Sequence, residues 1–408
     1  DYFTDGIAEE IINALSKIQA LRVASRSSAF AFKGKNLDIR EVGDKLGVST
    51  VLEGSVRKAG NRLRITAQLV NVADGYHLWS DRYDRQLDDV FAVQDEIAEN
   101  IVKALRVVLS ETEKRAIEQA RPENVQAYEY YLKGRQFSYQ YREKSLQFAR
   151  RMFQRAIEVD PSFARAYAGL ADISSMLYQW WDASDANLSQ ADTASRKALE
   201  LAPDLAAAHA SRGFALTLSK HYPEAEQAFE VALKLDPTLF EAYYFYARTC
   251  FQQGKLEAAA KLFEKASEVR PEDFQAQALL SGVYAGLGRT ADAEAARRRT
   301  IAKIEKHLEL NPDDARALYF GAGAISKLGN REKAIEWLER ARAVDPEDSA
   351  VLYNVGCVYS LLGDADNALA CLEQAVVHGY GHKEWVEHDS DLDSLRQLPR
   401  FQKLLASL

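Results

Sequence analysis

Apolar residues recur at helical spacing over most of the chain, and prolines end successive apolar segments at regular intervals. Because proline cannot continue a helix, each of these prolines marks a turn between helical segments. Successive prolines are 42, 34, 34, 41 and 34 residues apart. This spacing predicts a repeated helix–turn–helix unit, with about two extra helical turns in each of the longer units. The six prolines are Pro161, Pro203, Pro237, Pro271, Pro312 and Pro346.

Small and large apolar residues keep fixed positions within these units. Gly213 and Phe229 in one unit occupy the same offsets as Ala247 and Phe263 in the next. Small side chains let two helices cross closely, and large ones fill the space between neighbouring hairpins. A single hairpin cannot bury its apolar face alone, so we expect the units to stack on one another.

These offsets closely resemble the signature of the tetratricopeptide family. The resemblance implies an all-α superhelical solenoid whose concave surface is lined by the first helix of each hairpin. Aromatic and arginine side chains are the types that often dominate binding hot spots. The residues expected by register to line a partner-binding groove are Phe214, Tyr244, Arg248, Phe251, Tyr319, Tyr353 and Asn354. Several of them fit equally well in the core between repeats. Tyr178, Trp180 and Trp181 form a second candidate patch of aromatic side chains.

The first 110 residues follow a different pattern. Three runs alternate apolar and polar side chains, as half-buried strands do, and the turn-forming pairs Gly60–Asn61 and Asp74–Gly75 separate them. Helical spacing flanks these runs, so we predict a small α/β domain with helices against one face of a three-stranded meander. The expected strands cover 50–58, 62–72 and 77–83, with a short β-like run at 21–24, and the expected helices cover 6–18, 39–46 and 90–109.

Four stretches of this segment resemble the TolB-N-terminal-like domain of bacterial signalling proteins. They are Tyr2–Ile7, Val51–Arg57, Leu63–Leu69 and Gly75–Ser80. That family normally opens with one more strand, so we expect the first strand to be missing and the chain to be part of a longer protein. The resemblance implies the sensory or partner-binding end of a protein that carries an adenylate cyclase, serine/threonine kinase or winged-helix domain upstream.

Composition and charge narrow the classes of function. The 408 residues are 47% hydrophobic and 27% charged, with a net charge of −8. Neither half of the chain is basic, so nucleic acid is not an expected partner. No apolar run reaches the ~20 residues of a membrane span, so direct membrane insertion is not expected either. A protein or peptide is the expected partner, and the oligomeric state stays open, a homodimer included. The compartment is also open, between the cytoplasm and the extracytoplasmic side of an inner-membrane-anchored protein.

The sequence lacks the common catalytic and cofactor-binding motifs. It contains no phosphate-binding loop, nucleophile elbow or zinc-protease motif, so we expect no catalytic residue, no cofactor and no metal. Asp389, Asp391 and Asp393 begin like a calcium-binding loop, but Ser394 stands where that loop needs glycine and Arg400 where it needs glutamate. The favoured interpretation of these aspartates is an acidic helix start.

The expected domain order has four parts. A TolB-N-terminal-like α/β domain covers residues 1–110, a connecting helix covers 111–129, seven tetratricopeptide units cover 130–382, and a capping helix covers 383–408. Such a chain presents an extended binding surface rather than catalytic side chains, so we expect a protein-interaction and scaffolding module and not an enzyme. The alternative is a structural or oligomerisation module that regulates an upstream adenylate cyclase or kinase domain.

Overall fold

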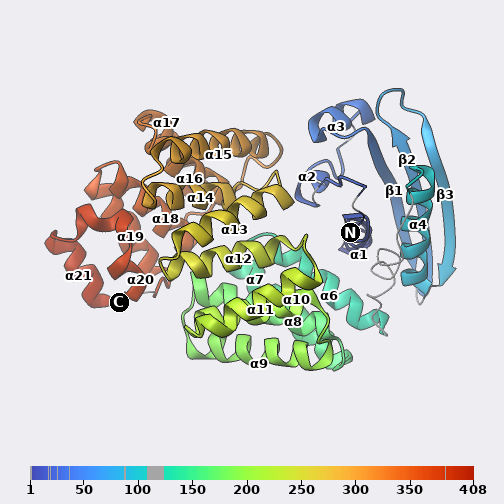
Figure 1. Ribbon diagram of the computed structural model, residues 1–408, viewed down its shortest axis with the longest axis horizontal. Coiled ribbons are helices and arrows are strands. Elements are labelled where there is room, and N and C mark those ends of the chain that lie inside the picture. The colour runs from blue at the N-terminus through green and yellow to red at the C-terminus, as the bar shows by residue number, and fades with distance from the viewer. Residues whose placement is uncertain are drawn as a thin grey trace. The chain divides into compact units, whose positions relative to one another are not determined.

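The described residues form two compact units (Figure 1). The computed structural model describes residues 2–16, 18, 20–24, 26–35, 37–86, 89–107, 124–381 and 383–408. One unit comprises Asp1–Tyr139 and Arg151–Phe163, and the other comprises Gln140–Arg150 and Ala164–Leu408. Most of the connecting helix expected at 111–129 lies outside the described residues, and the first helix after the gap begins at Val125.

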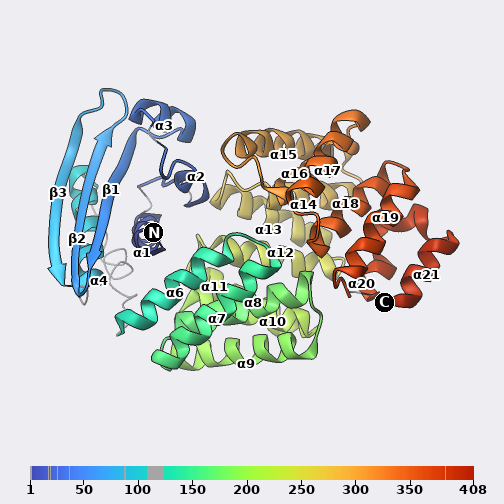
Figure 2. The same ribbon diagram turned by 180° about the vertical axis from the view of Figure 1, so that it is seen from behind.

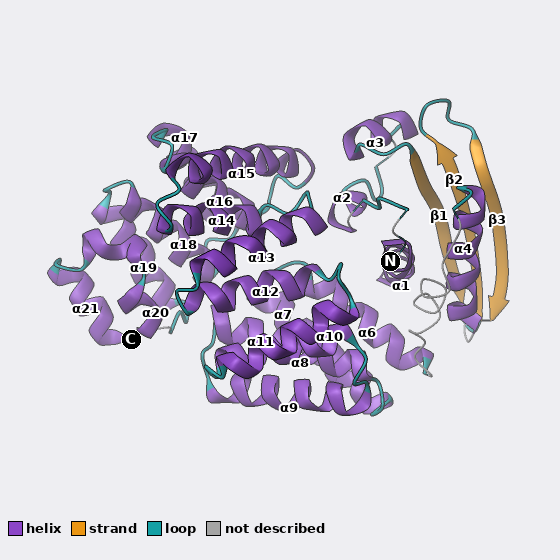
Figure 3. Ribbon diagram, in the orientation of Figure 1, coloured by secondary structure: helices purple, strands orange, loops and turns teal. Residues whose placement is uncertain are grey.

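The first unit contains a three-stranded antiparallel sheet in the order β1-β2-β3 (Figure 3). Gly60 and Gly75 occupy the left-handed region in the two turns, with φ of 57° and 75°, which glycine adopts without strain. The elements are α1 (Tyr2–Ser16), α2 (Arg26–Phe30), α3 (Ile39–Leu46), β1 (Thr50–Ala59), β2 (Arg62–Asn71), β3 (His77–Gln86) and α4 (Val90–Ala104). The predicted meander and its flanking helices are therefore confirmed.

The middle strand provides the apolar face of the sheet. Its alternating residues Leu63, Ile65, Ala67 and Leu69 are buried, as the period of two predicts. Helix α4 lies along β2 and β3, where the Tyr83 hydroxyl accepts a 3.0 Å hydrogen bond from Nδ2 of Asn100.

The β-like run at 21–24 is not a strand. In the described part of the sheet, β1 and β3 each pair with β2, and the run has no strand beside it. A run of four residues without ladder hydrogen bonds has nothing to hold it in a sheet, so the sequence-based expectation was wrong here.

Seven helical hairpins follow in the described part of the chain (Figures 1 and 2). Their first and second helices alternate along the chain, and from α8 onward the two helices of each hairpin pack against each other. The helices are α6 (Val125–Ser138), α7 (Glu143–Val159), α8 (Ala164–Trp180), α9 (Asp185–Leu201), α10 (Ala206–Leu218), α11 (Tyr222–Leu235), α12 (Phe240–Gln252), α13 (Leu256–Val269), α14 (Gln275–Gly286), α15 (Thr290–Leu310), α16 (Ala315–Ser326), α17 (Arg331–Val344), α18 (Ser349–Leu361) and α19 (Ala365–Val377).

All six prolines that set the sequence period lie in the turns between hairpins. The residue before proline is excluded from the helical region by the proline ring. Asp236 and Asp345 show this, with φ of −138° and −143° and positive ψ. The two longer units place their extra residues in helices, because α8 and α9 have 17 residues each and α15 has 21.

Close helix crossings depend on the small residues of the repeat. A Cβ atom at Gly213 would lie 2.8 Å from the ring of Phe229, and one at Gly356 would lie 3.0 Å from the side chain of Leu372. Contacts this short force the neighbour to move, so these positions favour glycine because of the space available and not because of backbone strain.

The end of the hairpin array is covered by α20 (Lys383–His388), a 3₁₀-helix η2 (Ser390–Leu395) and α21 (Pro399–Ser407). These short helices stand where one continuous capping helix was expected, and α21 is separate from η2 because Pro399 can begin a helix but cannot continue one. Leu395 and Phe401 are buried in the same core as α18 and α19. Among the described helices, none is both long and apolar enough to span a membrane.

Candidate functional site

Trp180, the last residue of α8, lies beside two arginines from distant hairpins of the second unit. The guanidinium carbon of Arg248 on α12 is 5.4 Å from the centroid of the Trp180 ring, and that of Arg316 on α16 is 5.8 Å from it. Both distances are short enough for cation–π attraction.

Two tyrosines complete this arrangement. The guanidinium carbon of Arg316 lies 3.8 Å from the ring centroid of Tyr141, and that of Arg248 lies 5.8 Å from the ring centroid of Tyr244. The ring centroids of Tyr141 and Trp180 are 6.0 Å apart. We call Tyr141, Trp180, Tyr244, Arg248 and Arg316 the Trp180 cluster.

The Trp180 cluster joins residues from both patches expected from the sequence. Tyr244 and Arg248 come from the expected groove, and Trp180 comes from the second aromatic patch. Arg316 and Tyr141 were missed. Nothing in the sequence marks them, because Arg316 is the second residue of a helix and Tyr141 lies in a turn, both outside the recurring offsets of the repeat.

The other expected groove residues differ in exposure. Phe214 is buried and Phe251 is 47% exposed. Tyr319 is half-buried and stacks on Phe320 with their ring centroids 5.2 Å apart. Asn354 donates a 2.8 Å hydrogen bond from Nδ2 to a backbone carbonyl of its own helix.

The guanidinium of Arg316 has no carboxylate partner in the described part of the structure. Its Nη1 atom is buried and makes no hydrogen bond there. Arginine keeps its charge in proteins, so the group cannot avoid the cost of burial by losing a proton. Burial also raises the pKa of the Tyr141 hydroxyl, although Arg316 acts in the opposite direction.

The carboxylates near Arg316 already accept hydrogen bonds at helix starts. Asp273 accepts from the amide of Ala276 at 2.9 Å, and Asp314 accepts from the amide of Ala317 at 3.0 Å. Asp314 also contacts Nε2 of His307 at 2.8 Å. These acids therefore accept hydrogen bonds at helix starts, and the charge of Arg316 acts to lower the pKa of both carboxyl groups although no ion pair joins them to it in the described part of the structure.

Trp181 has a structural contact of its own. The residue is buried, and its Nε1 atom lies 3.3 Å from the carboxylate of Asp348, which caps α18. Arg142 pairs with Asp345 at 3.0 Å on the same turn. The beginning of the array is thereby joined to its sixth and seventh hairpins. Tyr178, the third member of the aromatic patch, is half-buried on α8.

Tyr353 belongs to a buried network at the capped end. Its hydroxyl donates a 2.6 Å hydrogen bond to Asp389, and its ring stacks on Tyr380 with the centroids 4.3 Å apart. Burial raises the pKa of Tyr353 far above its ordinary value, so the hydroxyl stays a donor. Asp389 thus caps η2 and holds Tyr353, and the described residues contain no group of acids, histidines or cysteines arranged to hold a metal.

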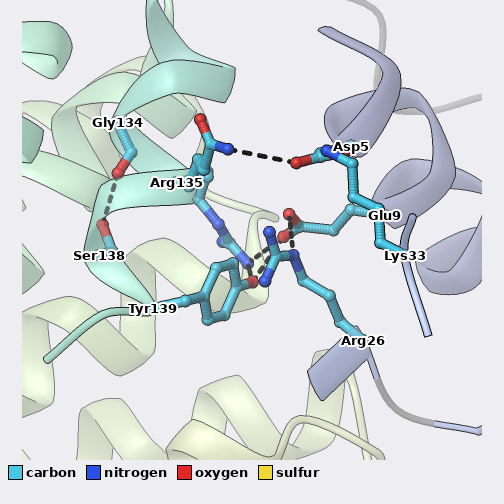
Figure 4. A network of polar contacts seen from close by, with 9 residues as sticks. Asp5, Glu9, Arg26, Lys33, Gly134, Arg135, Ser138 and Tyr139 are labelled. Atoms are coloured by element: carbon cyan, nitrogen blue, oxygen red, sulfur yellow. Dashed lines mark hydrogen bonds and ion pairs between the residues drawn. The ribbon is translucent and has the colours of Figure 1, made fainter. Parts of the chain in front are cut away.

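A second polar cluster lies in the first unit, between α1 and α6 (Figure 4). Glu9 on α1 is buried and accepts hydrogen bonds from Arg135 at 2.7 Å and from the Tyr139 hydroxyl at 2.5 Å. Its other carboxylate oxygen accepts from Nε of Arg26 at 3.1 Å. Burial raises the pKa of Tyr139 strongly, which keeps its proton available for Glu9.

Asp5 and Gly6 strengthen the same contact. Asp5 accepts a 2.6 Å bond from Lys33 and a 3.2 Å bond from Gln136 on α6. A Cβ atom at Gly6 would fall 2.3 Å from the side chain of Leu132. Both residues belong to the stretch Tyr2–Ile7 that resembles the TolB-N-terminal-like domain, so this stretch holds α6 against the α/β domain.

Two stretches of the chain match known families. Residues 216–283 and 349–376 match family models described as tetratricopeptide repeat. This chain contains tetratricopeptide repeats. Together with the fold described above, the match establishes a small α/β domain followed by a tetratricopeptide solenoid. Tetratricopeptide repeats are non-catalytic scaffolds that bind proteins or peptides.

One relative shares sequence with part of this chain. A protein of Rhizobium meliloti (strain 1021) named "Putative adenylate cyclase 3" is 44% identical over 229 residues, which are 56% of this chain and 39% of that protein. The chain therefore matches well under half the length of that relative.

Solved structures that resemble the chain are repeat proteins. The Cut9–Hcn1 hetero-tetramer of APC/C is 13% identical with a TM-score of 0.50, over 78% of this chain and 63% of that chain. A thermophilic tetratricopeptide protein of Thermus thermophilus is 21% identical with a TM-score of 0.37, over 49% of this chain and 96% of that chain. At these identities the likeness concerns the fold alone.

Proposed function

We propose that this chain is a protein-interaction module that binds a peptide or protein segment along the first helices of its repeats. The presence of tetratricopeptide repeats, which bind proteins or peptides, supports the class of function. The observation that carries the proposed location is the Trp180 cluster, where aromatic rings and two arginines from four separate hairpins meet. These are the residue types found at binding hot spots.

In this proposal the expected groove residues have two roles. Arg248, Phe251, Tyr319 and Asn354 are at least partly exposed and would touch the partner. Phe214, Tyr244 and Tyr353 are buried and would support that surface from below. The division into 1–110, 111–129, 130–382 and 383–408 and the TolB-N-terminal-like assignment remain part of the same proposal.

The proposed biological setting is a bacterial multidomain signalling protein. The relative named as an adenylate cyclase supports it, since the matched region covers 39% of that relative and leaves room for an effector. A second candidate function follows from the same comparison: a structural or oligomerisation module that regulates an adenylate cyclase or kinase domain in the same protein. Light scattering on the purified chain separates the two, because an oligomerisation module would be a stable oligomer without a partner.

Peptide selection tests the leading proposal directly. A random peptide library is panned against the purified chain, and the affinity of enriched peptides is measured by fluorescence anisotropy. Arg248→Glu should weaken binding at least about tenfold, because a central charge is reversed. Arg340→Glu is the matched control, since Arg340 is exposed on the second helix α17. Equal affinity for wild type and Arg248→Glu would refute the proposed location.

A further inference from the structure

Two distant parts of the second unit meet, although the three hairpins from α10 to α15 separate them along the chain. Arg142, just before α7, forms a 3.0 Å ion pair with Asp345, which follows α17. Nε1 of Trp181, just after α8, lies 3.3 Å from the carboxylate of Asp348, just before α18. The array therefore closes on itself through the turn before α7 and the end of α8.

At this closure the chain's own aromatic rings cover arginines of two first helices. The ring centroid of Tyr141, in the turn before α7, lies 3.8 Å from the guanidinium carbon of Arg316 on α16. The ring centroid of Trp180, at the end of α8, lies 5.4 Å from the guanidinium carbon of Arg248 on α12. A peptide is proposed to bind along these first helices, so part of its surface is already filled in the free protein.

The backbone of Tyr141 is strained. Its φ of 51° lies in the left-handed region, which bulky residues rarely adopt because Cβ comes too close to a carbonyl oxygen. In the turns inside the four later hairpins, the residues with this conformation are glycines, namely Gly254, Gly288, Gly329 and Gly363. Tyr141 thus pays its backbone cost where its ring packs on Arg316, and this cost makes the closed arrangement easier to open.

The polar contacts that hold the closure are individually weak. The side chain of Arg142 is 48% exposed, and an ion pair at such a position contributes little because water competes for both charges. The hydrogen bond from Trp181 is 3.3 Å long, which is beyond the usual range for an N–H donor. A ligand that binds only the open arrangement can therefore shift the equilibrium toward it with part of its binding energy.

We infer that Tyr141, Arg142 and Trp181 form an autoinhibitory cover over the first helices α12 and α16, which a peptide must displace before it binds. When the cover opens, the ring of Tyr141 leaves Arg316, and the contacts of Arg142 and Trp181 with the turn before α18 break. This inference rests on the proposed function, because it concerns the regulation of the same surface. Peptide affinity then depends on the fraction of molecules in which the cover is open.

Two variants should open the cover. Tyr141→Gly removes the ring and adopts the left-handed backbone without strain, and Arg142→Ala removes the ion pair. Peptides selected by panning should bind both variants at least about threefold more tightly than wild type, because the open fraction rises. Lys220→Gly is the matched control, since Lys220 has a φ of 61° in the turn between α10 and α11, and it should leave the affinity unchanged.

A distance measurement tests the opening directly. Lys144 on α7 and Glu347 in the turn before α18 are both exposed and can carry spin labels on introduced cysteines. The native cysteines are buried, which protects them from labelling. Saturating peptide should shift the distribution of distances between the labels to longer values, and Tyr141→Gly should do the same without peptide. A distribution that peptide leaves unchanged would show that the closure is a permanent part of the fold and would overturn the inference.

The outcomes separate the inference from the proposed function. Equal or weaker binding of the selected peptides by Tyr141→Gly would remove the cover and leave peptide binding intact. If wild type selects no peptide, the same library is panned against Tyr141→Gly. Selection by this variant alone would support both proposals, and selection by neither protein would remove both. Thermal melting checks that the variants are folded, and Arg142→Ala, a change at an exposed side chain, decides the affinity test if Tyr141→Gly does not fold.

Discussion

Trp181 and Asp348, which are 167 positions apart in the chain, are joined by a hydrogen bond in which the indole Nε1 donates to the carboxylate at 3.3 Å. The same carboxylate accepts from the amides of Ala350 and Val351 at 3.0 Å each. One side chain therefore begins helix α18 and also holds the end of α8. This contact brings Trp180, the neighbour of Trp181, to the arginines of two later hairpins.

The contact should make stability depend on pH through Asp348. Burial raises the pKa of Asp348, and nearby Asp345 adds to the rise, while hydrogen bonds from the Val351 amide and Trp181 oppose it. A raised pKa in the folded state means that the contribution to stability is full below the unfolded pKa and is lost as pH rises through the folded pKa. Asn in place of Asp348 keeps an acceptor without the charge, so Asp348→Asn should gain stability relative to wild type as pH rises from about 4 to 7. Urea unfolding across that range measures it.

Asp314 provides a control, because its effect on stability should change with pH in the opposite direction. It caps α16 as Asp348 caps α18, but its pKa is lowered because the hydrogen bonds from His307 and the Ala317 amide outweigh the effect of burial. Its contribution to stability is therefore present above the unfolded pKa and is lost as pH falls. Asp314→Asn should lose stability relative to wild type as pH rises over the acid range. Identical pH profiles for the two variants would contradict both assignments.

Replacing Gly213 should destabilise the protein even when the new residue is alanine. A Cβ atom there would lie 2.8 Å from the ring of Phe229, which is fully buried and stacks on Tyr246. We expect Gly213→Ala to lower the free energy of unfolding by about 1–3 kcal/mol, measured by urea denaturation.

Gly282 is the matched control for this substitution. It also lies inside a first helix, α14, but a Cβ atom there would meet nothing within 4 Å. Gly282→Ala should be neutral or should stabilise by up to about 1 kcal/mol, because alanine is the better helix former. A loss of stability at Gly282 equal to that at Gly213 would show that the helix crossing is not the cause.

Glu9 should couple α6 to the α/β domain. Glu9→Gln removes the charge that Arg26 and Arg135 share and leaves the two guanidinium groups without their carboxylate. Hydrogen bonds to charged groups contribute about 1.5–3 kcal/mol each, so a loss of roughly 2 kcal/mol in unfolding free energy is expected. Hydrogen exchange of the α6 amides should also become faster, because the helix loses one of its anchors.

Glu53→Gln, on the exposed face of β1, is the control for Glu9→Gln. It makes the same chemical change on the sheet. The free energy of unfolding should stay within about 0.5 kcal/mol of wild type, and the hydrogen exchange of the α6 amides should not change. Unchanged exchange in α6 for Glu9→Gln would mean that apolar contacts such as Gly6 with Leu132 hold the helix by themselves.

The sequence by itself determined the local elements of this protein. Proline spacing gave the hairpin turns, since a proline ring cannot continue a helix beyond its first turn. Alternation in the run that became β2 gave the buried face of the sheet, because a strand has a fixed period of two. The run at 21–24 shows the limit of such patterns, since a strand also needs a partner that no local pattern supplies.

Only the tertiary structure decided which residues meet. Trp180, Arg248 and Arg316 lie on three hairpins, and their proximity depends on the small rotation between each pair of neighbouring hairpins, summed over the array. That rotation is set by many packing contacts, so no motif in the chain records it. The sequence could therefore name Arg248 and Trp180 as separate candidates, but it could not join them or find Arg316. Likewise it showed Asp5 and Gly6 as part of a familiar stretch without showing that they hold α6, because the residues of α6 that they contact lie more than a hundred positions away.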